Sequence, residues 1–293
     1  MAEDVFSAAR LRSYRVLEAE GLGAAADLQI LATVVSARLW VPLSLIEIAF
    51  RNAADALVTA AHPRGSSWLF AADVPIEGPL EATSVTGADA FRGVEEEGWA
   101  DPDPVHTAAV MAGRLGRPAI TRDDVIAHLM LGFWVVRVPD ALRTEESPLH
   151  LFDSLAAYFD HKLGDGSALE RLMRTDILLT RNRVAHHEPV LIRAKHVFDK
   201  HTGSAKTGNE LVTSLQGALE KFERSAATIV RTARIMAPMA EATLEGIEAE
   251  LRDDLRPLRQ HLQARRAQLT ALRDARRAER RAGADEPAPP RGD

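Results

Sequence analysis

A long run of apolar residues at helical spacing extends from Ala24 to Ala61. Proline is tolerated in the first turn of a helix and destabilises its middle, and Pro42 stands inside this run. We therefore expect two helices here, separated or kinked at Val41-Pro42. Their apolar members recur every three or four residues, as one buried helix face requires: Leu28, Leu31, Val34, Val35, Leu39, Leu43, Ile46, Phe50, Ala53 and Leu57.

The same helical spacing recurs along the rest of the chain, whereas the apolar and polar alternation of strands is nearly absent. The sequence therefore predicts an all-α fold. Between the helices, residues 71–104 hold scattered Gly, Pro, Asp and Glu, which predicts an acidic surface loop or insertion. Further helices are expected at about residues 6–20, 104–116, 121–136, 149–163, 167–188 and 208–236.

Composition excludes several classes of protein. With 293 residues and 46% hydrophobic content, the chain can bury a large core. The sequence has no Cys, which excludes disulfides, Cys-ligated metals and a thiol nucleophile. The N-terminus lacks the pattern of a signal peptide, and no stretch reaches about 18 uninterrupted apolar residues, so we expect a cytoplasmic protein that does not enter a membrane.

The C-terminal third carries leucines at alternating spacings of four and three: Leu251, Leu255, Leu258, Leu262, Leu269 and Leu272. This spacing is typical of a short coiled coil or of a helix packed on the body of the protein, although Pro257 is unfavourable near its start. Arg265 fills the vacant leucine position. Residues 206–282 are expected to form long helices, and residues 283–293 a disordered tail.

The charges make an extensive nucleic-acid surface improbable on composition alone, since 36 basic and 42 acidic residues give a net charge of −6. Any contact with nucleic acid should therefore be local. The stretch from Arg171 to Lys206 is rich in Arg, Lys and His, and it is where we expect such a contact.

One short string within that stretch, RNRVAHHEP at residues 181–189, suggests chemistry. On a helix with about 100° per residue, Asn182 and His186 project to nearly the same side, opposite the apolar stripe of Ile177 and Val184. Arg181 lies about 100° from Asn182, so one helix does not pair Arg181 with His186. A second copy related by a two-fold axis could bring these polar faces into one cleft.

Such a cleft would suit cleavage of a phosphodiester. His186 could exchange a proton near neutral pH, and Arg181 could neutralise the phosphate oxygens. No metal or other cofactor is required. The structural alternative is that these residues simply cap a helix end and meet solvent.

Three polar residues in the apolar stretch at 44–58 could have either a structural or a functional role. Glu47 and Arg51 are four residues apart, so a helical ion pair is the default interpretation. Asn52 beside Arg51 repeats the Arg-Asn of the second motif, so Glu47, Arg51 and Asn52 are candidates for supporting or RNA-contacting roles. A metal site is not expected, because the adjacent His186 and His187 cannot both coordinate one ion from a regular helix.

Three stretches together resemble the Abi-like, or abortive-infection, branch of the HEPN superfamily. LLTRNRVAHHEPV at residues 178–190 resembles the family's motif helix, SLIEIAFRNAADALV at 44–58 its N-terminal helix, and TRDDVIAHLMLGFWVV at 121–136 its central helix. The resemblance covers about residues 12–200. It implies a HEPN-like helical bundle over residues 1–205, with the 71–104 insertion and an extended helical C-terminal segment.

The resemblance also implies a function, that of a metal-independent endoribonuclease in a toxin or antiphage system, with its site at a homodimer interface. Arg181, Asn182 and His186 take the catalytic positions, and His187 and Arg183 are auxiliary. RNA would be cut by 2′-OH attack, and an antitoxin or a phage-derived trigger would control the activity. The alternatives are a non-catalytic helical module that binds RNA or a partner, using Arg265 to Arg281, and a structural dimer built on the leucine repeat.

Overall fold

The structure is a computed structural model that describes residues 7–61, 68, 122–141 and 150–284. Every regular element in these ranges is a helix, so the all-α prediction is confirmed. Extended backbone pairs at an isolated bridge between Phe198 and Ala205. The helix expected at 104–116 and the acidic loop expected at 71–104 lie outside the described residues.

The chain forms two compact units, each assembled from separate stretches of sequence. The first unit contains Met1–Leu39, Arg183–Ala227 and Glu245–Asp293, and the second contains Trp40–Asn182 and Thr228–Leu244. Position 205, where the sequence analysis places a domain boundary, lies inside the first unit.

The first unit begins with α1 (Ala8–Ala19), whose two ends follow from local sequence. At its start, the Ser7 hydroxyl accepts a hydrogen bond from the Arg10 N–H at 3.4 Å. At its end, Gly21 adopts a φ of 74°, a left-handed conformation that glycine tolerates without steric cost. The backbone N–H of Leu22 then reaches the Leu17 carbonyl, and the Leu22 side chain is fully buried.

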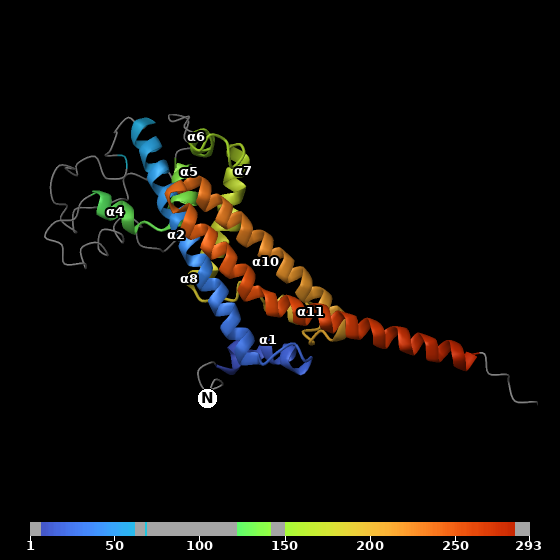
Figure 1. The fold of residues 1–293 in the computed structure, drawn as a ribbon. Coiled ribbons are helices and arrows are strands. Elements are labelled where there is room, and N and C mark those ends of the chain that lie inside the picture. The colour runs from blue at the N-terminus through green and yellow to red at the C-terminus, as the bar shows by residue number, and fades with distance from the viewer. Residues whose placement is uncertain (1–6, 62–67, 69–121, 142–149, 285–293) are drawn as a thin grey trace, which may run out of the picture. The chain divides into compact units, whose positions relative to one another are not determined.

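Two long helices, α10 (Gly208–Met236) and α11 (Glu241–Ala284), contribute most of the remaining first unit and lie side by side there (Figure 1). An Arg259–Glu223 ion pair joins them, and the Arg266 guanidinium donates to Gln216 Oε1 at 3.1 Å. The bounds expected for α10 are confirmed. The α11 helix passes through Pro257 and ends at Ala284. The sequence analysis therefore expected the helix to end two residues earlier than it does.

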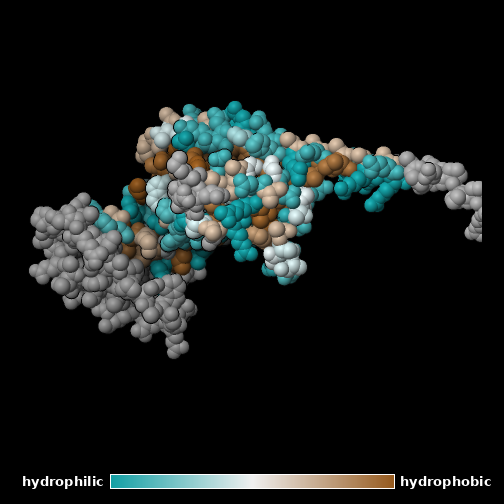
Figure 2. Space-filling view, turned by 90° about the horizontal axis from the view of Figure 1, so that it is seen from below, coloured by the Kyte–Doolittle hydropathy of each residue, from teal (hydrophilic) through white to brown (hydrophobic). Residues whose placement is uncertain are grey.

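The leucine face of α11 is buried along only part of its length. The side chains of Leu251, Leu255, Leu258 and Leu262 are buried, whereas Leu272 is 51% exposed. In the space-filling view, the part of α11 that precedes the uncertain terminal residues is mainly hydrophilic (Figure 2). The packed-helix alternative is therefore confirmed as far as Leu262, and a coiled coil with another chain stays a prediction.

The helix α2 (Ala25–Ala61) is continuous through Pro42, so the prediction of two separate helices is wrong. An interior proline costs about 3 kcal/mol. The side chains of Leu39, Leu43 and Ile46 around it are each at most 1% exposed, and full burial of such a side chain contributes about 1.5–3 kcal/mol. Burial of the flanking apolar residues thus outweighs the cost of the proline.

By length and composition, α2 is also apolar enough to cross a membrane. The same properties are found in helices that lie in the core of a protein, and 39% of the residues in its most apolar window are buried. The helix also carries charged residues with protein partners, among them Arg38, which pairs with Glu250 and Asp254 in the first unit. Its composition alone therefore does not establish a membrane span.

The second unit holds the C-terminal part of α2 and several shorter helices. The prediction of a single helix at 121–136 is wrong. The helix α4 (Arg122–His128) ends at a break at Leu129-Met130, and a π-helical segment, Phe133–Arg137, follows the break. Two further short helices are α5 (Val138–Ala141) and α6 (Leu151–Tyr158). The helix α6 is shorter than the predicted 149–163, because Asp160 and His161 adopt positive φ angles directly after it.

The helix that carries the RNRVAHHEP motif is a continuous helical run composed of α7 (Gly166–Arg171), a π-helical segment (Leu172–Ile177) and α8 (Leu178–Ala185). Asp165 Oδ1 caps its start by accepting from the Ala168 N–H at 2.8 Å. Met173 and Ile177 are fully buried and Val184 is 6% exposed. The predicted buried stripe is therefore confirmed.

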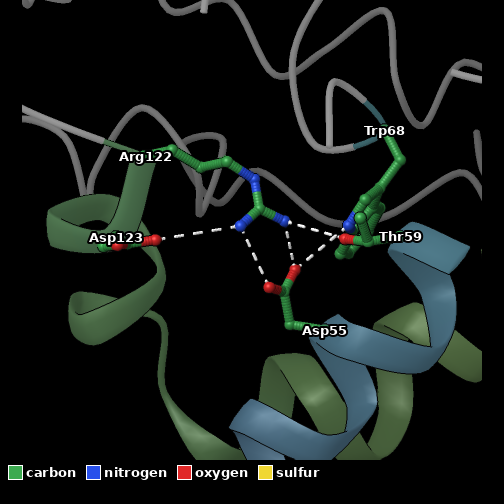
Figure 3. Close-up of polar contacts among 5 residues, drawn as sticks. All are labelled: Asp55, Thr59, Trp68, Arg122 and Asp123. Atoms are coloured by element: carbon green, nitrogen blue, oxygen red, sulfur yellow. Dashed lines mark hydrogen bonds and ion pairs between the residues drawn. The ribbon is translucent and has the colours of Figure 1, made fainter. Parts of the chain in front are cut away.

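Asp55 of α2 fixes the two described ends of the segment between Trp68 and Arg122 (Figure 3). Its carboxylate accepts hydrogen bonds from Trp68 Nε1 at 3.1 Å and from Arg122 Nη1 at 3.0 Å. The Arg122 guanidinium also donates to the Thr59 hydroxyl. Residues far apart in sequence thus meet on one buried carboxylate.

Candidate active site

Arg181, the first residue of the motif, is held by Glu47 of α2. The Arg181 Nε donates to Glu47 Oε2 at 3.1 Å, and Nη2 lies 3.4 Å from Oε1. Both side chains are mostly buried, with exposures of 18% and 17%. This two-point contact uses the planar fork of arginine, which fixes the orientation of the guanidinium as well as its position.

Glu47 also caps the helix that begins after the break at Leu129-Met130. Its Oε1 accepts from the Leu131 N–H at 3.0 Å, which satisfies a backbone donor that a helix start leaves without a partner. Four residues along α2, the Arg51 guanidinium donates to the Ala127 carbonyl at 2.9 Å, on the other side of the break. Glu47 and Arg51 therefore stabilise an interruption of the backbone.

The default expectation of a Glu47–Arg51 ion pair is thus wrong, because Glu47 pairs with Arg181 and Arg51 binds backbone. Burial lowers the pKa of Arg51, and the negative charge of Glu47 partly offsets this effect. Asn52 lies on the exposed side of α2. The structure supports Glu47 as a positioning residue for Arg181, and it gives no contact that would link Asn52 to the motif.

The two histidines of the motif occupy the end of α8. The His187 N–H donates to the Val184 carbonyl, and the Glu188 N–H donates to the Arg183 carbonyl at 2.8 Å. This is the Schellman arrangement, which makes His186 the C-cap and His187 the residue that adopts the left-handed conformation, with a φ of 54°. Pro189 follows, where a helix cannot continue. The helix therefore ends three residues before the predicted Glu188.

His186 is exposed at this helix end, and Asn182 precedes it by one turn. Val184 is buried, whereas His186 is exposed and Asn182 is half-buried. Leu179, seven residues before His186 and therefore on the same face, is 47% exposed. The exposure of His186 agrees with its predicted orientation away from the apolar stripe, and the orientation of Asn182 stays a prediction.

The geometry divides the motif into an anchored residue and an outward face. Arg181 is anchored on α2, His186 is exposed, and His187 forms the cap. The sequence reasoning missed the contact of Arg181 with Glu47, because no periodic pattern links positions 134 residues apart. Among the described residues, no group of three or more His, Asp or Glu side chains could hold a metal ion.

Comparison with known proteins places this chain in no group. No protein-family model, curated protein or solved structure matches it.

Proposed function

We propose that this chain is a metal-independent endoribonuclease that acts on cytoplasmic RNA, of the kind that the HEPN-like motif implies. The observation that carries the proposal is the arrangement of RNRVAHHEP at a helix end. Glu47 orients Arg181 by two contacts, while His186 is exposed directly after the last residue of the same helix. An oriented cation and an exposed imidazole are the two groups that cleavage of a phosphodiester needs.

The reaction would proceed by attack of the ribose 2′-oxygen on the adjacent phosphorus. A His186 imidazole takes the 2′-OH proton, the new P–O bond forms, and the bond from phosphorus to the 5′-oxygen breaks. A second imidazole, or the same one after protonation, gives a proton to the departing 5′-oxygen. Arg181 stabilises the negative charge on the non-bridging oxygens. The products are a 2′,3′-cyclic phosphate and a 5′-hydroxyl.

A second copy of the chain would supply the second imidazole. The outward face of α8 combines the exposed Leu179 with Asn182 and His186, and an apolar residue beside polar ones suits a two-fold contact between identical helices. We therefore propose a homodimer with His186 of both copies at its interface. An activity that damages cellular RNA fits a toxin or antiphage effector that an antitoxin or a phage-derived trigger controls.

A non-catalytic module that binds RNA or a partner is the second candidate. The observation that favours it is the use of two Arg181 nitrogens by Glu47, which leaves fewer donors for a substrate. In this alternative, the same surface binds RNA without cutting it.

Incubation of purified protein with labelled single-stranded RNA in EDTA distinguishes the two candidates. The wild type should cut the RNA, and His186→Ala and Arg181→Ala should each lower the rate at least about 100-fold, as expected for loss of acid-base catalysis or of charge stabilisation. His201→Ala, at an exposed histidine outside the motif, is the matched control and should cut normally. Equal rates for all four proteins would assign any cleavage to another site.

A further inference from the structure

A group of cations lies close together in the first unit. None of its members forms an ion pair among the described residues, whereas Arg259 and Arg265 of the same unit pair with Glu223 and Glu20. We call this group the basic cluster, and its members are Arg183, Arg193, Lys195, Lys206 and Lys221.

The backbone around α9 (Ala194–Val197) brings three of these residues together. The Lys206 N–H donates to the Val197 carbonyl at 2.8 Å, so the chain folds back on itself after α9. The Lys206 ammonium then donates to the backbone carbonyl of Lys195 at 3.3 Å. Arg193 precedes the same short helix, and its N–H donates to His196 Nδ1 at 3.2 Å.

Two more cations extend the basic cluster onto neighbouring helices. Lys206 Nζ also lies 3.2 Å from the Ser214 hydroxyl of α10, and Lys221 is seven residues further along, on the same helix face. A Cβ added to Gly217, between Ser214 and Lys221, would meet nothing within 4 Å, so the surface is open there. Arg183 belongs to the last turn of α8, three residues before His186.

The members of the basic cluster repel one another. Arg193 is the largest cause of a lowered pKa at Lys195, and burial followed by the charge of Arg183 lowers the pKa of Arg193. Burial and then the cations of the basic cluster lower the pKa of His196 to about 4. The nearby Asp199 carboxylate accepts hydrogen bonds from His201 and Thr202 of its own turn. Hydrogen bonds from Thr202 and His201, and then the charge of Lys206, lower the pKa of Asp199, so this carboxylate offsets part of the positive charge. Folding still brings five cations together in a chain of net charge −6.

We propose that the basic cluster binds the phosphodiester backbone of RNA and delivers the strand to His186. Its cations come from α8, the α9 turn and α10 and include exposed lysines, so they suit successive phosphates of a polymer better than one small anion. Arg183 connects the basic cluster with the motif along α8. This inference rests on the proposed function, since it supplies the substrate surface for that site.

Salt-dependent RNA binding tests the proposal with full-length protein. His186→Ala serves as the parent, so that the labelled 20-nucleotide single-stranded RNA stays intact. Adding Lys195→Glu and Lys221→Glu should weaken binding at least about tenfold. It should also reduce the slope of log Kd against log salt by about 1.4, because each phosphate contact to a single strand contributes about 0.7. Adding Lys162→Glu and Arg252→Glu instead makes the same charge change at exposed positions and should leave the slope unchanged.

The outcomes separate this inference from the proposed function. An unchanged slope and affinity in the Lys195 and Lys221 variant, with native circular dichroism, would overturn the basic cluster as the RNA surface, even if the wild type cuts RNA. A selective loss of binding supports the surface even if the wild type proves inactive. If the parent binds polyglutamate but not RNA, the basic cluster serves an acidic protein segment and the proposal is wrong.

Discussion

At the scale of single residues, Glu47 joins two elements of the second unit to α2. It accepts from Arg181 and from the Leu131 backbone while mostly buried. We expect Glu47→Gln to lower the free energy of unfolding by about 2 kcal/mol, since hydrogen bonds that involve a charged group contribute about 1.5–3 kcal/mol. Urea unfolding measures this change. Glu250→Gln, which removes a half-exposed carboxylate paired with Arg38, should cost under about 1 kcal/mol, and equal losses would contradict the assigned role of Glu47.

His187 holds a backbone conformation that favours glycine. Its φ of 54° costs a residue with a Cβ about 1 kcal/mol, so His187→Gly should raise the free energy of unfolding by about 0.5–1 kcal/mol in the same assay. Ala185→Gly, at the last residue of α8, should instead lower it, by less than the cost of about 1 kcal/mol that glycine has in a helix interior. A loss of stability in His187→Gly would mean that the imidazole makes contacts that outweigh the strain.

His196 links stability to pH. Its pKa is about 4 in the folded chain and about 6.5 when unfolded. Between these values the unfolded chain binds a proton that the folded chain does not, so the His196 contribution to stability is lost as pH falls from 6.5 to 4. His196→Asn keeps an acceptor for the Arg193 N–H and should flatten this part of the curve of unfolding free energy against pH. A curve identical to the wild type's would contradict the lowered pKa.

At the scale of helices, the sequence could predict the fold class and the buried helix faces. It could not predict helix ends and breaks that depend on contacts between residues far apart in the sequence. The buried stripe of the helical run from α7 to α8 and the bounds of α10 followed from apolar spacing alone. The sequence did not predict that α2 continues through Pro42, because burial of the flanking residues offsets the local cost of proline. It also did not predict the break at Leu129-Met130, because Glu47 caps the helix that begins after the break. The pairing of Glu47 was missed for the same reason, since its partner comes from a distant helix.

The contacts of Asp55 make a prediction about the segment between Trp68 and Arg122. Because both residues bind the same carboxylate (Figure 3), a short Gly-Ser linker in place of residues 71–119 should leave the fold intact. We expect the helical circular dichroism of the remaining chain and a Tm within a few degrees of the wild type. Asp55→Ala in the shortened chain should lower that Tm, and loss of cooperative unfolding on shortening alone would show that the segment is needed for folding.

At the scale of the whole molecule, a chain with a negative net charge brings the cations of the basic cluster together. The candidate site combines residues from separate stretches of sequence, since Glu47 precedes its partner Arg181 by 134 positions. The sequence motif could suggest the chemistry of Arg181 and His186. It could not supply the orientation of Arg181 or the basic cluster, which depend on how the helices pack.

Sequencing RNA ends in cells that express the chain tests the proposed ribonuclease activity most directly. Wild-type expression should generate new 2′,3′-cyclic phosphate ends and 5′-hydroxyl ends, and His186→Ala expressed at the same level should generate neither. Identical RNA ends in the two cultures would contradict the assignment of His186 as the catalytic residue.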